Sequence, residues 1–375
     1  MLNKEDILSL KLSSRFCRRK QLNLPDIKAI VEECSAELRM KAPELICCES
    51  LTRSFNAFHL MGEPYIIYDA CLIEALYIYD LILASGAKQQ DMDRFFYKLF
   101  GEECISNRDL VHALYFAGKY RSVQYSFDLN EGAYSQVKSQ IACQSYFLIG
   151  HELGHLKLKE PNSEGIPAGY KQFIRAAIGV TTRKGMKEKN LSISEYALRY
   201  GDFFPVSSPP QSLYEYLDML MENGKFVAFM EECYCDFIGY QLLKEKYGDT
   251  DFFINAISKA LNYLLTQEAI RSDLHDGVKQ VKDVHRDITV TLFYSGQRVI
   301  MLLLALGMNH NGEMKKAYVD THDRDQLTDR LTSYIQELPD EDVMNRVSEV
   351  NLSNNDRERL EKILMREFYY CSVVP

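Results

Sequence analysis

Residues 133–158 carry the pattern that most constrains this chain, a long amphipathic helix with two histidines one turn apart. The motif is His151-Glu152-Leu153-Gly154-His155, an H-E-x-x-H sequence. At about 100° per residue, the two histidines lie roughly 40° apart on one face of the helix. The opposite face is apolar and carries Ala142, Tyr146, Ile149, Leu153 and Leu156. We therefore expect this helix to pack its back into a core and to present both imidazoles to a cleft.

An alternative interpretation is a buried helix whose histidines only make hydrogen bonds. For a single histidine this would be the better interpretation. Two histidines at positions i and i+4, with Glu152 between them and an apolar back face, favour a metal site instead. Two neutral imidazole nitrogens one turn apart suit tetrahedral zinc.

A catalytic zinc site needs a third protein ligand and an open position for water. The next strong helical pattern, 225–247, contains Glu231, Glu232 and Asp236. Glu232 and Asp236 are four residues apart and share a helix face. We expect Glu232 to coordinate the metal and Asp236 to accept a hydrogen bond from a ligand histidine. Glu231 is the competing ligand, but it has no acid four residues later.

The ten cysteines are irregularly spaced and mostly lie in apolar stretches, which is typical of free buried thiols. Cys233 and Cys235 lie in the same helical pattern as Glu232. Their side chains point about 200° apart, so they cannot share one metal and are interpreted as small core residues. Residues 1–10 carry three charges and do not resemble a secretory signal. We therefore expect a reducing, cytoplasmic location.

The net charge of −9 argues against a nucleic-acid partner. Basic runs near residues 15–20 and 184–189 are interpreted as solvated surface. The most apolar run, 299–308, is too short for a membrane span. With 375 residues and 46% hydrophobic content, the chain is long enough for one large catalytic domain or two smaller ones.

The periodicities predict a mostly helical α+β chain in three parts. These are an N-terminal helical segment (1–60), a catalytic domain (61–336) and a C-terminal helical tail (337–375). Residues 65–68 predict a strand that leads into a helix, and the alternation at 121–129 predicts a half-buried strand. The remaining helical patterns are at 251–268, 284–308, 325–337 and 356–370.

Prolines and glycines interrupt residues 159–223. This composition predicts a broken insert with two short helices, placed between the two ligand-bearing helices. A cytosolic hydrolase must be restrained, so we interpret the insert as a lid or regulatory element.

The two motifs, residues 150–155 and Glu232-x-x-x-Asp236, resemble those of the gluzincin metallopeptidases, the group of thermolysin and of the CAAX-prenyl-protease and HtpX-like enzymes. Because it has no predicted membrane spans, the chain is more similar to the soluble Lit-like phage-exclusion peptidases. The resemblance implies a minimal zincin-type domain, with Glu232 as third ligand and Asp236 behind a ligand histidine. It also implies that the strand at 121–129 is the edge strand that pairs with substrate.

Gluzincins usually add a His, Tyr or Arg that stabilises the oxyanion. The resemblance makes His322 the candidate, with Arg330 on the following helix, although the expected proline after the histidine is replaced by Asp323. His285 is the alternative, and the role stays open between them.

Together these features predict a zinc metalloendopeptidase with His151, His155 and Glu232 as ligands and Glu152 as general base. Its expected partner is an intracellular protein or peptide substrate, with room for a regulatory partner. A function in phage defence and a function as a toxin-like protease both stay open. The alternative is a sensor or interaction protein that binds zinc without cleaving peptides.

Overall fold

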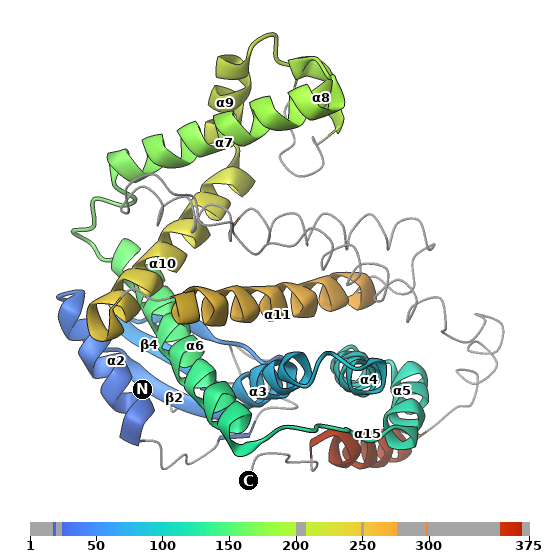
Figure 1. The fold of residues 1–375 in the computed structure, drawn as a ribbon. Helices are drawn as coiled ribbons and strands as arrows, with labels where there is room; N and C mark the ends of the chain where they lie inside the picture. The colour runs from blue at the N-terminus through green and yellow to red at the C-terminus, as the bar shows by residue number, and fades with distance from the viewer. Residues whose placement is uncertain are drawn as a thin grey trace.

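The computed structural model describes residues 18–19, 25–199, 208–248, 251–275, 298 and 353–369. Within these residues the fold is mostly helical with one small mixed sheet, in agreement with the expected α+β class (Figure 1). The strands are β1 (Arg18–Arg19), β2 (Glu44–Glu49), β3 (Asn56–Leu60) and β4 (Glu63–Asp69). The helices are α2 (Pro25–Glu37), α3 (Ala70–Ala84), α4 (Gln89–Ser106), α5 (Leu110–Ser122), α6 (Glu131–Leu158), α7 (Ala168–Lys189), α8 (Ile193–Arg199), α9 (Leu213–Glu222), α10 (Gly224–Tyr247), α11 (Asp251–His275) and α15 (Asn354–Tyr369).

The sheet has the strand order β1-β2-β4-β3, so β3 forms one edge of it among the described strands. β2 pairs with β4 in parallel, and β3 pairs with β4 in an antiparallel hairpin. The hairpin turns through Met61 and Gly62, whose φ angles are 53° and 84°. Two consecutive positive φ angles are the signature of a type I′ turn, whose twist matches that of paired strands. This turn fixes Leu60 opposite Glu63 and so fixes the register of β3.

β4 leads directly into α3, as the pattern at 65–68 predicts. Asp69 ends the strand and caps the helix, because its carboxylate accepts a hydrogen bond from the backbone N–H of Cys71. The same carboxylate accepts bonds from the backbone and the hydroxyl of Ser50. The residue therefore joins the strand, the helix and the loop after β2.

α6 is the central helix of the main core and packs against α2, α3, α10, α11 and β3. Asn130 caps its start by accepting from the N–H of Ala133. The apolar stripe expected from the sequence is confirmed from Tyr146 onward, where its residues are at most 1% exposed. Ala142 is exposed, so the buried part of the stripe begins one turn later than expected.

The segment between α6 and α10 folds into an arm made of α7, α8 and α9 (Figure 1). The prediction of two short helices is wrong here, because α7 alone has 22 residues. The arm has a small core of its own, which it shares with the first half of α10. That core contains Ile174, Ala177, Ile178, Ala197, Tyr216, Leu217, Leu220, Phe226, Phe229, Met230 and Cys233.

The strand expected at 121–129 is wrong. α5 continues to Ser122, and the chain from 123 to 130 forms no ladder with another described strand. Its backbone groups bond instead to side chains of α4 and of Lys88, the residue before α4. Arg94 donates to the carbonyl of Val123, and Gln90 donates to that of Gln124. Lys88 donates to the carbonyl of Ser126, and Asp91 accepts from the N–H of Ser126. The alternation of apolar and polar residues in this segment reflects burial, because Val123, Tyr125 and Phe127 pack against the main core.

The expectation that residues 1–60 are helical is also wrong for 44–49 and 56–60, which form β2 and β3. The helix pattern at 251–268 is confirmed by α11 and the pattern at 356–370 by α15. Apart from Arg298, the patterns at 284–308 and 325–337 lie outside the described residues. None of the described helices combines the length and apolar character that a bilayer crossing requires. The three-part domain division stays a prediction.

The buried amide of Gln144 links three helices of the main core, one of them through the buried carboxyl group of Asp80. The Nε2 group of Gln144 in α6 donates to Asp80 Oδ2 in α3 at 3.0 Å and to the carbonyl of Ala256 in α11 at 3.1 Å. Asp80 Oδ1 and Gln144 Oε1 are both buried without a hydrogen-bond partner among the described residues. Burial raises the pKa of Asp80 to about 6, against smaller lowering effects of Lys259 and Gln144. Both atoms are acceptors, so a proton on Asp80 would supply a donor between them.

We expect Asp80→Asn to raise the free energy of unfolding at pH 8 and to leave it nearly unchanged at pH 4. Because the pKa of Asp80 is raised in the folded state, the free energy of unfolding of the wild type falls as pH rises from about 4 to above 6. The loss is on the order of 2–3 kcal/mol at most. The asparagine side chain cannot ionise and keeps an acceptor for Gln144. Urea unfolding at several pH values measures the effect.

The control is Asp80→Ala, which removes one of the two acceptors of the Gln144 amide and should destabilise the protein at every pH. Burial also raises the pKa of Asp69 to about 6. Both variants retain Asp69, so part of the dependence of the free energy of unfolding on pH remains in both. Equal slopes for wild type and Asp80→Asn between pH 4 and 7 would contradict the prediction.

Candidate metal centre

The site depends on an unusually close crossing of α6 and α10. A Cβ atom added to Gly150 would lie 2.9 Å from the Cα of Gly239, and one added to Gly239 would lie 2.6 Å from the backbone oxygen of Phe147. One turn further, a Cβ on Gly154 would lie 3.2 Å from the sulfur of Cys235. Only glycine allows the two backbones to approach this closely. The crossing brings the histidines of α6 next to the acids of α10.

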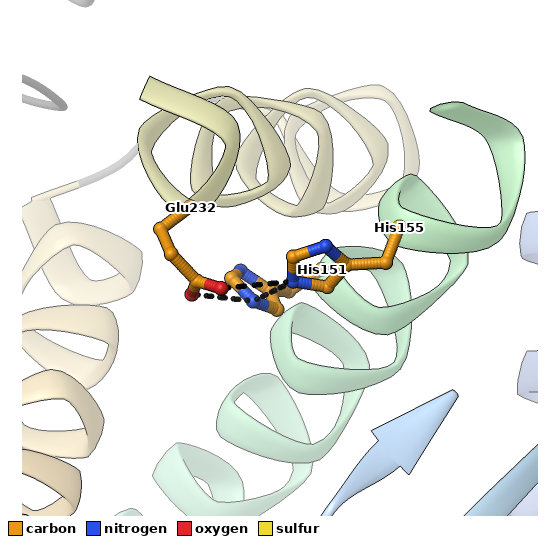
Figure 2. A group of neighbouring side chains, drawn as sticks. All are labelled: His151, His155 and Glu232. Carbon is orange, nitrogen blue, oxygen red and sulfur yellow. Dashed lines mark hydrogen bonds and ion pairs between the residues drawn. The ribbon is translucent and has the colours of Figure 1, made fainter. Parts of the chain in front are cut away.

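His151, His155 and Glu232 meet between the two helices (Figure 2). The Nε2 atoms of the two histidines are 3.1 Å apart. Glu232 Oε2 lies 3.4 Å from His151 Nε2, and Glu232 Oε1 lies 3.3 Å from His155 Nε2. The structure thus brings together all three predicted ligands, and each offers one donor atom to a common point.

The other ring nitrogen of each histidine faces a carboxylate. His151 Nδ1 lies 2.8 Å from Asp236 Oδ1, and His155 Nδ1 lies 2.9 Å from Glu231 Oε1. An ionised carboxylate can only accept, so each Nδ1 carries the proton. Both Nε2 lone pairs then point at each other and at the Glu232 carboxylate. Such a convergence of lone pairs needs a cation between them, either protons on the rings or one metal ion.

The pKa values of His151 and Glu232 also favour positive charge between these groups. Burial lowers the pKa of His151, but Asp236 and Glu232 outweigh it and raise this pKa to about 10. Burial raises the pKa of Glu232, but hydrogen bonds from both histidines and the charge of Arg298 hold it well below its usual range. Without a metal the site therefore attracts protons, and with one the same carboxylates stabilise the ion.

Glu152, the expected general base, lies on α6 beside the three donors. Its Oε2 atom accepts a hydrogen bond from the backbone N–H of Ala57 in β3 at 2.8 Å. Burial raises the pKa of Glu152, and the neighbouring charges of His151, His155 and Glu232 also act on it. The residue therefore lies between the donor group and the edge strand, a contact that the sequence did not predict.

Asp236 lies where the sequence places it, fully buried behind His151. Glu231 does not compete with Glu232 as a ligand, because it faces the outer ring nitrogen of His155 and not the common point. Cys233 and Cys235 are free and buried, which confirms their interpretation as small core residues.

Arg298 is a site residue that the sequence reasoning missed. Its guanidinium donates to both oxygens of Asp236 and lies against Glu232. The only local signal was a single arginine directly before the apolar run 299–308. The predicted oxyanion group, His322 with Arg330, and the alternative His285 all lie outside the described residues.

Comparisons of this chain with protein-family models, with curated proteins and with solved structures find no match.

We expect Gly239→Ala to weaken metal binding and to destabilise the fold. The added methyl group would lie 2.6 Å from a backbone oxygen of α6, so the helices must separate and the donors on α10 move away from the histidines. Calorimetry with Zn²⁺ and thermal unfolding measure the two effects.

The matched control is Gly118→Ala in α5, where an added Cβ meets nothing within 4 Å. In an open helical position this change stabilises by roughly 0.5–1 kcal/mol and should leave metal affinity unchanged. If both variants bind metal like the wild type, the close crossing does not control the site.

Asp236→Ala should lower metal affinity about 10–100-fold, and Glu231→Ala should lower it less. Asp236 is completely buried and holds the more buried histidine, whereas the Glu231 side chain is 32% exposed and water can replace it. Competition with a chromophoric chelator measures both affinities. Glu245→Ala, an exposed acid of α10, is the control. Equal losses in the Glu231 and Asp236 variants would contradict the ranking.

Proposed function

We propose that this protein is a zinc-dependent peptidase, with His151, His155 and Glu232 as metal ligands and Glu152 as general base. The observation that carries the proposal is the convergence of three donor atoms on one point, with the Glu152 carboxylate beside them. The proposed substrate is an intracellular protein or peptide. The family proposal, a gluzincin-like enzyme, rests on the order of the same residues in the chain.

The spacing of the donors supports zinc. Bonds of about 2.0–2.1 Å in tetrahedral geometry place neighbouring donor atoms roughly 3.3 Å apart. Here the two Nε2 atoms are 3.1 Å apart, and each lies 3.3 or 3.4 Å from one of the two Glu232 oxygens. Two imidazoles and one carboxylate are also a donor set that catalytic zinc sites use.

His151, His155 and Glu232 would hold the zinc ion, which would lower the pKa of a water molecule toward neutrality and polarise the carbonyl that is attacked. Glu152 would take a proton from the attacking water and deliver it to the leaving amine. Burial raises the pKa of Glu152, and a higher pKa makes a carboxylate a stronger proton acceptor. Asp236 and Glu231 keep the ligand histidines in the tautomer whose Nε2 atoms are free to bind.

The edge strand β3 replaces residues 121–129 as the proposed substrate-binding strand. His59 lies opposite Pro64, which has no N–H, so this pair cannot exchange two ladder hydrogen bonds. By alternation, the backbone groups of Ala57 and His59 point away from β4, and the Ala57 N–H indeed reaches Glu152. An extended peptide that pairs with this edge would pass beside the metal ligands.

The decisive experiment compares wild type with Glu152→Gln. We expect the variant to bind zinc as the wild type does and to lose cleavage by at least about 100-fold, because removing a general base typically costs 10²–10⁴ in rate. Elemental analysis measures the zinc, and mass spectrometry of protein termini in cells that express each form measures the cleavage.

Glu131→Gln, an exposed acid at the start of the same helix, serves as the control and should cleave normally. New termini that appear equally with Glu152→Gln would exclude the proposed base. Stoichiometric zinc with no cleavage by the wild type would favour the alternative, a zinc-binding protein without peptidase activity.

A further inference from the structure

Arg298 joins the metal ligands from a part of the chain remote from both ligand helices. Its Nε donates to Asp236 Oδ2 at 2.8 Å and its NH2 group to Asp236 Oδ1 at 2.7 Å. The third nitrogen, NH1, lies 3.2 Å from Glu232 Oε2. The side chain is only 14% exposed, so water screens these contacts weakly.

We propose that Arg298 is a positioning residue of the metal site, which holds Asp236 and Glu232 in their binding orientations at the same time. The proposal rests on the metal site proposed above and adds a residue that neither the motif nor its spacing indicates. Arg298 acts through the two carboxylates and not on the substrate.

The contacts form a closed ring of four side chains. Glu232 faces His151 Nε2, His151 Nδ1 faces Asp236, Asp236 binds Arg298, and Arg298 returns to Glu232. In such a ring no member can turn without breaking a contact on each side. A ligand carboxylate and a ligand histidine are therefore oriented by one guanidinium.

The charge of Arg298 is as important as its shape. Asp236 is 0% exposed, and an ionised carboxylate is costly at such depth unless it is paired. The bidentate pair compensates the buried carboxylate and holds it facing His151 Nδ1, so that the Nε2 atom of His151 is turned toward Glu232. A lysine has one nitrogen and cannot reach both oxygens of Asp236 and Glu232 together.

The second histidine has a weaker arrangement of the same kind. His155 faces Glu231, and Lys159 Nζ lies 4.0 Å from that carboxylate. The Lys159 side chain is 55% exposed, so it can leave this position at little cost. His151, anchored by Asp236 and Arg298, is thus the more rigidly held ligand of the two.

The test is metal affinity in Arg298→Gln and Arg298→Lys, measured by chelator competition with Zn²⁺ alone. We expect Arg298→Gln to lower affinity about 10–100-fold and Arg298→Lys to restore little of it. The visible spectrum of the Co²⁺-loaded variants should also change, because the Glu232 ligand is no longer held in place. Arg94→Gln, which removes another buried arginine that binds backbone carbonyls at the end of α5, is the control and should bind metal normally.

A double-mutant cycle separates positioning from general destabilisation. In an Asp236→Asn background, Arg298→Gln should have a clearly smaller effect than in the wild type, because its main partner is already changed. Equal effects in both backgrounds would overturn the proposal. Where Arg298→Gln fails to fold, the Arg298→Lys variant decides: wild-type affinity and spectrum in that variant also overturn it. If the wild type binds no metal, both this inference and the proposed function are overturned. If the wild type and Arg298→Gln bind metal equally well, only this inference is overturned.

Discussion

The contact between Gly150 and Gly239 sets the distance on which the rest of the site depends. Two helices with ordinary side chains at their crossing lie about 8–10 Å apart, and the missing side chains here allow a closer approach. At this distance the short reach of a glutamate is enough to meet two imidazoles on the neighbouring helix. Burial of α6 on its other faces, against α2, α3, α11 and β3, keeps it from moving away. The core of the protein thus determines the position of the polar groups.

Most charged groups of the site lie next to an opposite charge or an imidazole. Asp236 has Arg298, Glu231 has Lys159 nearby, and Glu232 faces two imidazoles and the same arginine. Glu152 differs from them, since the hydrogen bond that it accepts comes from the neutral backbone N–H of Ala57. Burial raises the pKa of Glu152 against the lowering effects of His151 and His155, and a raised proton affinity is a property that the proposed general base needs.

The sequence predicted the parts of the site that depend on helical geometry alone. Spacing of four residues placed His151 beside His155 and Glu232 beside Asp236, and the two helix patterns had nearly correct limits. Contacts between distant segments could not be predicted in this way. Nothing in the local pattern shows that Ala57 reaches Glu152, or that Arg298 binds Asp236. The strand expected at 121–129 failed for a related reason: alternation reports which side chains are buried, but the backbone there bonds to side chains of α4 instead of to a strand.

The arm formed by α7, α8 and α9 has a consequence for how the chain finds this structure. Its small core is made of residues that are near one another in sequence, from Ile174 to Cys233. A flexible connection as long as residues 159–223 would cost on the order of 4 kcal/mol in chain entropy before α6 and α10 could meet. Once the arm is folded, contacts between residues near one another in sequence fix much of this connection. The pairing of α6 and α10 then closes a shorter flexible connection, which favours a faster search for it.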